Sequence, residues 1–271
     1  MSYLDLFHYC LTGPEKGRRW VFVHGLMGYS NNWRKIISGL EVTERVFVYD
    51  QRGHGRSIKP ATGYAPEDYS EDLYTLTEEL GWDHFILVGH SMGGRNAMNF
   101  AHRYPEKLTH LIVEDIGPEA TENAAAYYEN LLSLVPTPFA NRQSAKAFFQ
   151  TEFLAKAKAR DRIEVLAQFL YANLEEKPDG TVDWRFSKSG ILETVKLGQP
   201  RDRWHEVESL RMPTLWIRGE NSQELSHENF EKILRSNKMI KGVEIPGAGH
   251  WVHSDQPGLF QQALQDFVGG F

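Results

Sequence analysis

The stretch LVGHSMGG, residues 87–94, places a serine between glycines where an apolar run gives way to a helical pattern. The run HFILVGH (84–90) is short and almost continuously apolar, which is typical of a strand buried on both faces of a parallel sheet. The segment SMGGRNAMNFAHRYP (91–105) predicts a helix that ends at its proline. The pattern G-x-S-x-G at this strand-to-helix turn therefore presents the hydroxyl of Ser91 at the carboxyl end of the strand.

Five further short apolar runs predict more strands of the same kind. They are WVFVHG (20–25), RVFVYD (45–50), LIVED (111–115), TLWIRG (214–219) and GVEIPG (242–247). Helical patterns separate several of them, for example at 66–81, and a last helix is predicted over 257–271. This alternation predicts an α/β domain with a mostly parallel central sheet and flanking helices. The N-terminal segment 6–23 predicts an antiparallel hairpin that turns at Pro14–Gly17.

Residues 117–205 break the alternation of strand and helix. Only helices are predicted there, over 124–135, 144–160, 162–174 and 189–197, with a turn at KPDG (177–180). We therefore expect a core formed by 1–116 and 206–271, and an inserted helical cap over 117–205. The alternative is that these helices pack over the sheet as ordinary crossover connections.

The composition restricts the class of protein. The chain has 271 residues, a net charge of −6 and no basic run, so the charge gives no support for a nucleic-acid or membrane partner. The single cysteine, Cys10, cannot form an internal disulfide, and the N-terminus does not resemble a signal peptide. We expect a soluble, cytoplasmic monomer or small homo-oligomer that acts on a small molecule. No metal-ligand spacing or nucleotide-binding glycine pattern is found, so no metal or cofactor is predicted.

Three other motifs follow predicted strands, and parallel strands bring their carboxyl ends to one edge of a sheet. VHGLMG (23–28) ends a strand in a glycine-rich turn, where the backbone N–H of Leu26 would be available. Together with the N–H of Met92 it would form an oxyanion hole. YDQRGHGRS (49–57) ends the next strand, and IPGAGHWVH (245–253) holds His250 in a loop before the last helix.

Taken together, these motifs resemble the α/β-hydrolase family across essentially the whole chain. They resemble most the cap-bearing esterase and thioesterase branch. The resemblance implies that Ser91 is the nucleophile and His250 its general base. His253, in the same segment, is a weaker alternative for the base.

The position of the third member of the triad departs from the usual family pattern. The usual acid lies in the loop after the penultimate strand, here ENSQEL (220–225), but the expected position holds Ser222. A carboxylate at the end of an apolar strand is costly unless it is paired, and LIVED ends on Glu114 and Asp115. The chain resembles a small esterase branch with the acid at this alternative place, which implies Asp115 as the partner of His250. Glu114 and the late loop remain alternatives.

The expected activity is that of a serine hydrolase. It would cleave carboxylic esters or thioesters of small to medium acyl groups through an acyl-enzyme. Met27, Trp33 and Trp251 are the expected walls of the acyl pocket. The rival hypotheses are hydrolysis of a carbon–carbon bond on the same fold, and a ligand receptor with little turnover.

Overall fold

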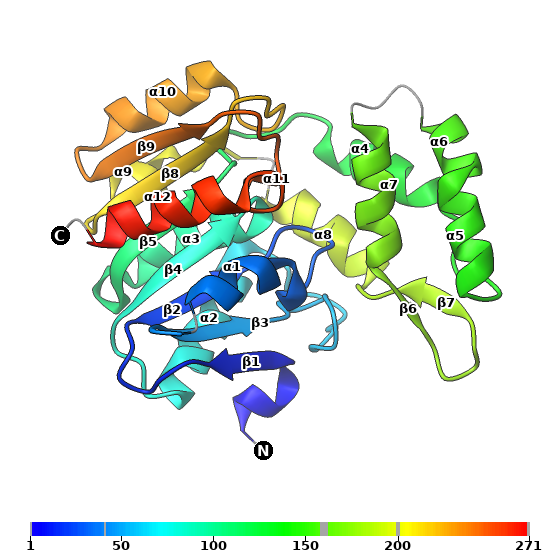
Figure 1. Ribbon diagram of the computed structural model, residues 1–271, viewed down its shortest axis with the longest axis horizontal. Helices are drawn as coiled ribbons and strands as arrows, with labels where there is room; N and C mark the ends of the chain where they lie inside the picture. The colour runs from blue at the N-terminus through cyan, green and yellow to red at the C-terminus, as the bar shows by residue number, and fades with distance from the viewer. Residues whose placement is uncertain (1, 41, 158–161, 199–200, 270–271) are drawn as a thin grey trace.

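A computed structural model describes residues 2–40, 42–157, 162–198 and 201–269 of the chain (Figure 1). Its main sheet has seven strands in the described residues, in the order β1-β3-β2-β4-β5-β8-β9. All neighbouring pairs are parallel except β1 with β3, so the predicted mostly parallel sheet is confirmed. The strands are β1 Tyr9–Thr12, β2 Arg19–Val23, β3 Arg45–Tyr49, β4 Phe85–His90, β5 Leu108–Glu114, β8 Thr214–Gly219 and β9 Ile240–Ile245.

The predicted N-terminal hairpin is wrong in its pairing. A turn does form, because the N–H of Gly17 donates to the carbonyl of Pro14 at 3.0 Å. Strand β1 nevertheless pairs antiparallel with β3, with Tyr9 opposite Tyr49, and not with β2. Both edges of β2 are occupied by its parallel neighbours β3 and β4, so β1 can add only at the outer edge of β3.

Helices cover both faces of this sheet, as Figure 1 shows. On one face α2, α3, α9 and α10 form an apolar core with alternate strand residues, and on the other face α1, α11 and α12 do the same. Within the described chain, none of the helices is long and apolar enough to cross a membrane. The bounds are η1 Tyr3–Leu6, η2 Ser30–Trp33, α1 Arg34–Leu40, α2 Pro66–Glu79, α3 Met92–Arg103, η3 Pro105–Lys107, α9 Trp204–Glu208, α10 His227–Ser236, α11 Val252–Asp255 and α12 Pro257–Gly269.

A helical insertion separates β5 from β8 and lies beside the sheet in Figure 1. It also contains an antiparallel pair of strands, so the prediction of helices only is wrong. The predicted turn KPDG joins these strands, with the N–H of Lys177 donating to the carbonyl of Thr181 at 2.8 Å. Strands of three residues are too short to give a periodic signal. The bounds are α4 Ala124–Ser133, α5 Arg142–Gln150, α6 Glu152–Lys156, α7 Ile163–Ala172, β6 Leu174–Glu176, β7 Val182–Trp184 and α8 Lys188–Gly198.

The two ends of the insertion are hydrogen-bonded to each other. The N–H of Arg203 donates to the carbonyl of Pro118 at 2.7 Å. Helix α9 starts directly after this contact and packs on α3 and α10, so residue 205, the predicted end of the cap, lies inside a helix of the sheet part. The ends of two predicted helices, 158–160 and 270–271, lie outside the described residues.

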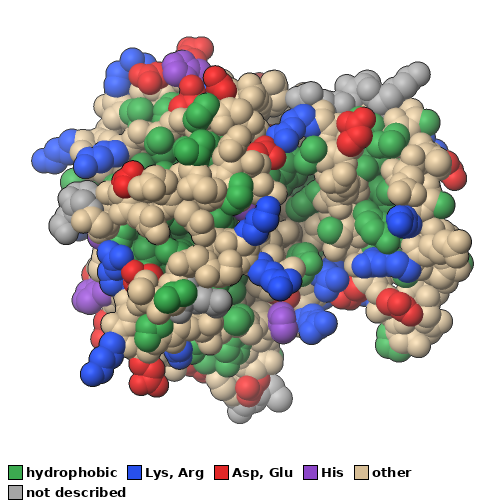
Figure 2. Space-filling view, viewed as in Figure 1, with side chains coloured by type: hydrophobic (Ala, Val, Ile, Leu, Met, Phe, Trp, Pro, Cys, Tyr) green, Lys and Arg blue, Asp and Glu red, His purple; other side chains and the backbone are tan. Residues whose placement is uncertain are grey.

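The insertion has its own apolar core, which continues into the loops at the strand ends. Residues Leu26, Met27 and Met92 of the sheet part belong to the same cluster as the buried residues of α4, α5, α7 and α8. In Figure 2 hydrophobic side chains are visible in the hollow between the two parts, with charged side chains around it. The insertion is therefore packed against the carboxyl ends of the strands, where the loops that carry Leu26, Met27 and Ser91 lie.

Candidate active site

Ser91 lies at the apex of a strained turn between β4 and α3. Its backbone has φ 54° and ψ −118°, which is unusual for a residue that is not glycine. A Cβ at Gly89 would lie 2.4 Å from the carbonyl oxygen of Gly93, and one at Gly93 would lie 2.4 Å from that of Val23. The turn therefore requires both glycines of the G-x-S-x-G motif.

Three side chains from distant parts of the sequence form one hydrogen-bonded chain at this turn. The Ser91 hydroxyl donates to Nε2 of His250 at 3.0 Å, and Nδ1–H of His250 donates to Oδ2 of Asp115 at 2.8 Å. Asp115 is fully buried, whereas His250 keeps part of its surface exposed. The structure thus brings together the three residues that the sequence predicted as the triad. The arrangement can hold a proton on Nδ1 while Nε2 accepts one from the serine.

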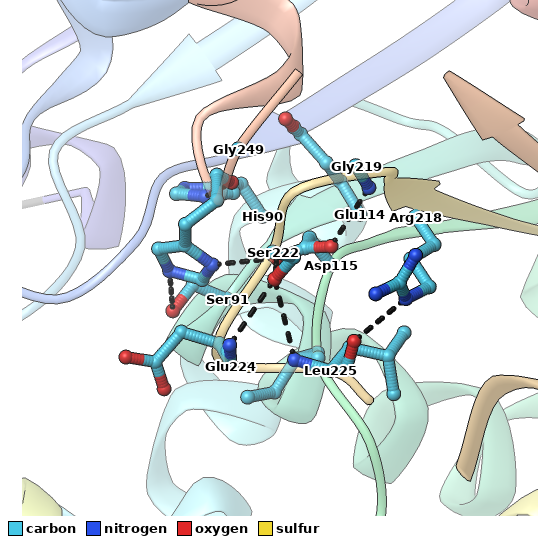
Figure 3. Close-up of polar contacts among 12 residues, drawn as sticks. His90, Ser91, Glu114, Asp115, Arg218, Gly219, Ser222, Glu224, Leu225 and Gly249 are labelled. Carbon is cyan, nitrogen blue, oxygen red and sulfur yellow. Dashed lines mark hydrogen bonds and ion pairs between the residues drawn. The ribbon is translucent and has the colours of Figure 1, made fainter. Parts of the chain in front are cut away.

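Asp115 is held by two further donors, one at the end of the neighbouring strand β8 and one in the loop after it. The N–H of Gly219 donates to Oδ1 at 3.0 Å, and the hydroxyl of Ser222 donates to Oδ2, as Figure 3 shows. Ser222 occupies the position where the usual family pattern has its acid. Its hydroxyl contacts the carboxylate that is hydrogen-bonded to His250.

The other acids of the late loop do not contact His250 by a hydrogen bond. Glu220 accepts the N–H of Gly247 at 2.8 Å and so fixes the turn before the histidine. Glu224 is exposed, and its side chain lines the cavity beside Ser91. Its backbone N–H donates to the Ser222 hydroxyl at 3.1 Å, and its carboxylate has no hydrogen-bond donor among the described residues.

The environment of His250 favours its protonated form. Burial lowers the pKa of the imidazole, but the hydrogen bond and the charge of Asp115 raise it more, with smaller increases from the charges of Glu224 and Glu114. The net pKa lies above the usual 6.5. A base of this kind can receive a proton from a hydroxyl and hold it during a reaction.

Two neutral histidines fix the loop after β2. His54 accepts the N–H of Met27 at 3.1 Å, and His24 accepts the N–H of Gln51 at 3.0 Å. Burial lowers the pKa of both imidazoles, which keeps their acceptor nitrogens unprotonated. The N–H of Met27 is therefore already used. The N–H of Leu26 makes no hydrogen bond with the described residues, and the N–H of Met92 is in the first turn of α3.

A cavity of about 80 Å³ lies over the Ser91 hydroxyl. Its walls include the predicted pocket residues Met27, Trp33 and Trp251, although the Trp33 side chain is also packed against Phe22 from the sheet. Helices of the insertion supply the opposite wall, through Tyr127, Tyr128, Leu131, Leu166 and Phe169. Met92 is not among the lining residues.

A second acid–histidine pair lies beside the first, and the sequence did not indicate it. Glu114 is fully buried and accepts both the N–H and Nδ1–H of His253, at 2.8 and 2.9 Å. His90 packs on His250 and His253 with ring centroids 4.7 and 5.0 Å away. His90, Glu114 and His253 could offer ligands to a metal ion. Glu114 is already satisfied by the two donors from His253, so hydrogen bonding accounts for the cluster.

A mostly parallel sheet of this order, with a serine turn after its central strand and a histidine after its last strand, defines a hydrolase of the α/β-hydrolase fold. The chain belongs to the alpha/beta hydrolase fold family, whose sequence profile matches residues 21–257.

Known relatives cover almost the whole chain. The 2-(acetamidomethylene)succinate hydrolase of Mesorhizobium japonicum is 28% identical over 98% of this chain and 94% of its own. The sn-1-specific diacylglycerol lipase of Mus musculus is 31% identical over 98% of this chain and 85% of its own. Among solved structures, a marine microorganism esterase superposes with a TM-score of 0.81 at 29% identity, over 96% of this chain and 98% of its own.

Proposed function

We propose that this protein is a serine hydrolase that cleaves carboxylic esters or thioesters of small to medium acyl groups. The observation that carries the proposal is the hydrogen-bonded chain from Ser91 through His250 to Asp115, which opens onto a cavity. Similarity to an esterase and a lipase supports an acyl substrate.

In the proposed reaction, Ser91 Oγ attacks the acyl carbon as its proton passes to Nε2 of His250. The N–H groups of Leu26 and Met92 stabilise the oxyanion. The bond from the acyl carbon to the alcohol oxygen or thiol sulfur then breaks, and His250 gives its proton to the leaving group. Water, deprotonated by His250, releases the acid from the serine. Asp115 orients the imidazole and stabilises its charged form.

The same proposal assigns the chain to the cap-bearing branch with the acid after β5. Two facts support it: Asp115 is the carboxylate within hydrogen-bond reach of His250, and residues of α4 and α7 wall the cavity. We take the cap as the predicted segment 117–205 without its last two residues, which belong to α9 of the sheet part. We also propose that the protein acts in the cytoplasm, since its free cysteine, Cys10, is exposed.

A cavity of about 80 Å³ is small compared with typical ligand pockets of about 300–1,000 Å³. Most of its lining side chains are apolar or aromatic, with Met27 and Trp251 on the sheet side. This favours short acyl chains over long ones. Large substrates such as emulsified triglycerides would require the cap to move.

A second candidate reaction is hydrolysis of a 2-(acetamidomethylene)succinate-like compound. Similarity to the Mesorhizobium japonicum enzyme over 98% of this chain favours it. Such a compound carries two carboxylates, and the described residues that line the cavity include no lysine or arginine. We therefore rank this reaction below ester hydrolysis.

The test is a kinetic panel of acyl esters and acyl-CoA thioesters of graded chain length, together with labelling by a fluorophosphonate probe. We expect turnover of short esters, labelling of the wild type, and loss of both in a folded Ser91→Ala variant. Labelling that persists in Ser91→Ala would show that another residue is the nucleophile.

Two outcomes would favour the rival hypotheses. Cleavage of a vinylogous diketone with no turnover of esters would favour carbon–carbon bond hydrolysis. A correctly folded wild-type protein that neither labels nor turns over any ester would favour a receptor.

A further inference from the structure

The described residues that line the cavity over Ser91 include one Asp or Glu residue, Glu224, and no lysine or arginine that could neutralise its charge. His24 and His90 are kept neutral there, since burial lowers the pKa of both. A further lining histidine, His253, is paired with the buried Glu114, which leaves Glu224 as the acid of the described lining without a paired side chain.

The backbone around Glu224 is hydrogen-bonded to Ser222, the residue that also contacts Asp115 of the proposed triad. Its backbone N–H and that of Leu225 donate to the Ser222 hydroxyl, at 3.1 and 3.3 Å, and Ser222 in turn donates to Asp115. In Figure 3 the Glu224 carboxylate lies on the same side of the site as the Ser91 hydroxyl. These three hydrogen bonds thus fix the backbone of Glu224 relative to the nucleophile.

The Glu224 carboxylate makes no ion pair or hydrogen bond with the described residues. Two arginines are the candidate partners, and the charge of one of them, Arg95, interacts with that of Glu224 without a hydrogen bond between the two side chains. Arg162 binds Asp255 through two contacts of 2.8 and 3.0 Å. Arg95 donates to the backbone carbonyls of Glu119 and Gly198, at 2.6 and 3.3 Å. Neither arginine lines the cavity.

We propose that Glu224 makes this site select substrates by charge. It accepts uncharged or cationic acyl groups and rejects those that carry a carboxylate of their own. This proposal rests on the proposed ester hydrolase function. The physical reason is that a second negative charge near Glu224 is repelled across a partly desolvated pocket, whereas an uncharged group of the same shape is not.

The test compares two esters of matched shape, p-nitrophenyl hydrogen adipate and its uncharged amide isostere. The quantity measured is the ratio of kcat/KM for the amide to kcat/KM for the acid, in which any effect common to both substrates cancels. We expect the wild type to favour the amide by about tenfold, because the carboxylate of the acid substrate is repelled by the carboxylate of Glu224. The ratio should fall as salt is added, since Glu224 is exposed.

Three variants locate the charge responsible. Glu224→Gln should bring the ratio close to one, and Glu224→Lys should reverse the preference. Glu228→Gln makes the same change in net charge at an exposed position on α10 outside the lining, and should keep the wild-type ratio.

The outcomes separate this proposal from the one on which it rests. If the amide ester is hydrolysed and Glu224→Gln leaves the ratio at its wild-type value, charge selection by Glu224 is wrong and the hydrolase proposal stands. The same holds if the wild type shows no preference. If neither ester is hydrolysed and the fluorophosphonate probe does not label Ser91, both proposals are wrong.

Discussion

Two acid–histidine pairs lie side by side in this protein and differ in what surrounds them. The acids, Glu114 and Asp115, are consecutive residues, and the histidines, His250 and His253, lie three residues apart in one segment. Both acids are fully buried, and the hydrogen bonds from Nδ1 are 2.9 Å in the Glu114 pair and 2.8 Å in the Asp115 pair. Residue type and local geometry are therefore almost the same.

The difference is the contact with the serine: both histidines line the cavity, but His250 is the one hydrogen-bonded to Ser91. Asp115 leaves the strand with φ 53°, which turns its carboxylate toward the loop that holds His250. The Nε2 of that histidine faces the Ser91 hydroxyl. His253 is only 4% exposed and stacks on Trp33 with ring centroids 4.4 Å apart. An acid–histidine pair therefore becomes a candidate base only where the Nε2 atom of the histidine faces both a hydroxyl group and an open space.

The largest expected effect comes from removing the charge of the pair that faces Ser91. Asp115→Asn should lower kcat on the order of 10⁴-fold, because the amide no longer holds His250 with its proton on Nδ1. Ester turnover under saturating substrate measures it. Glu220→Gln provides a matched control in the late loop and should have a far smaller effect. Near-normal kcat in Asp115→Asn, with loss in Glu220→Gln or Glu224→Gln, would place the acid in the late loop.

The same change in the second pair should act on stability more than on rate. In Glu114→Gln one of the two donors from His253 loses a good acceptor, which should cost about 1–3 kcal/mol in the free energy of unfolding. We expect kcat to stay within about tenfold of the wild type, since the substitution changes neither the exposure of His250 nor its contact with Ser91. Urea unfolding and ester kinetics on the same preparation measure both effects. A loss of kcat as large as that in Asp115→Asn would abolish the distinction between the pairs.

The smallest expected effect is a shift in pH dependence. Only neutral His250 can accept the serine proton, so kcat/KM should rise with pH through the pKa of this imidazole. Because the surroundings raise that pKa, the midpoint should lie above 6.5. Glu224→Gln should move the midpoint to lower pH, since it removes one of the negative charges that raise the pKa. A wild-type midpoint below 6.5 would contradict the electrostatics described for Asp115 and Glu224.

The sequence alone predicted the class of fold and the places along the chain of the candidate nucleophile, base and acids. Short apolar runs separated by helical patterns predicted six of the strands, and the start of β5 differs most, since it begins at Leu108 and not at 111. The glycines around Ser91 and the acid at the end of an apolar run are local signals. A tight turn and a buried charge impose requirements on the residues themselves, so both can be recognised without knowledge of their partners.

Which of these groups come into contact depends on how distant segments of the chain pack together. Asp115 and His250 are 135 residues apart, and Glu114 and His253 are 139 apart, so no local pattern distinguishes their pairing from the alternatives. The same holds for β1, whose partner depends on which strand edge the rest of the sheet leaves open. It also holds for Ser222, whose hydroxyl reaches Asp115 from the loop after the neighbouring strand β8. Periodicity reports whether a residue is buried, whereas the partner of a buried polar group is set by the packing of segments far apart in the chain.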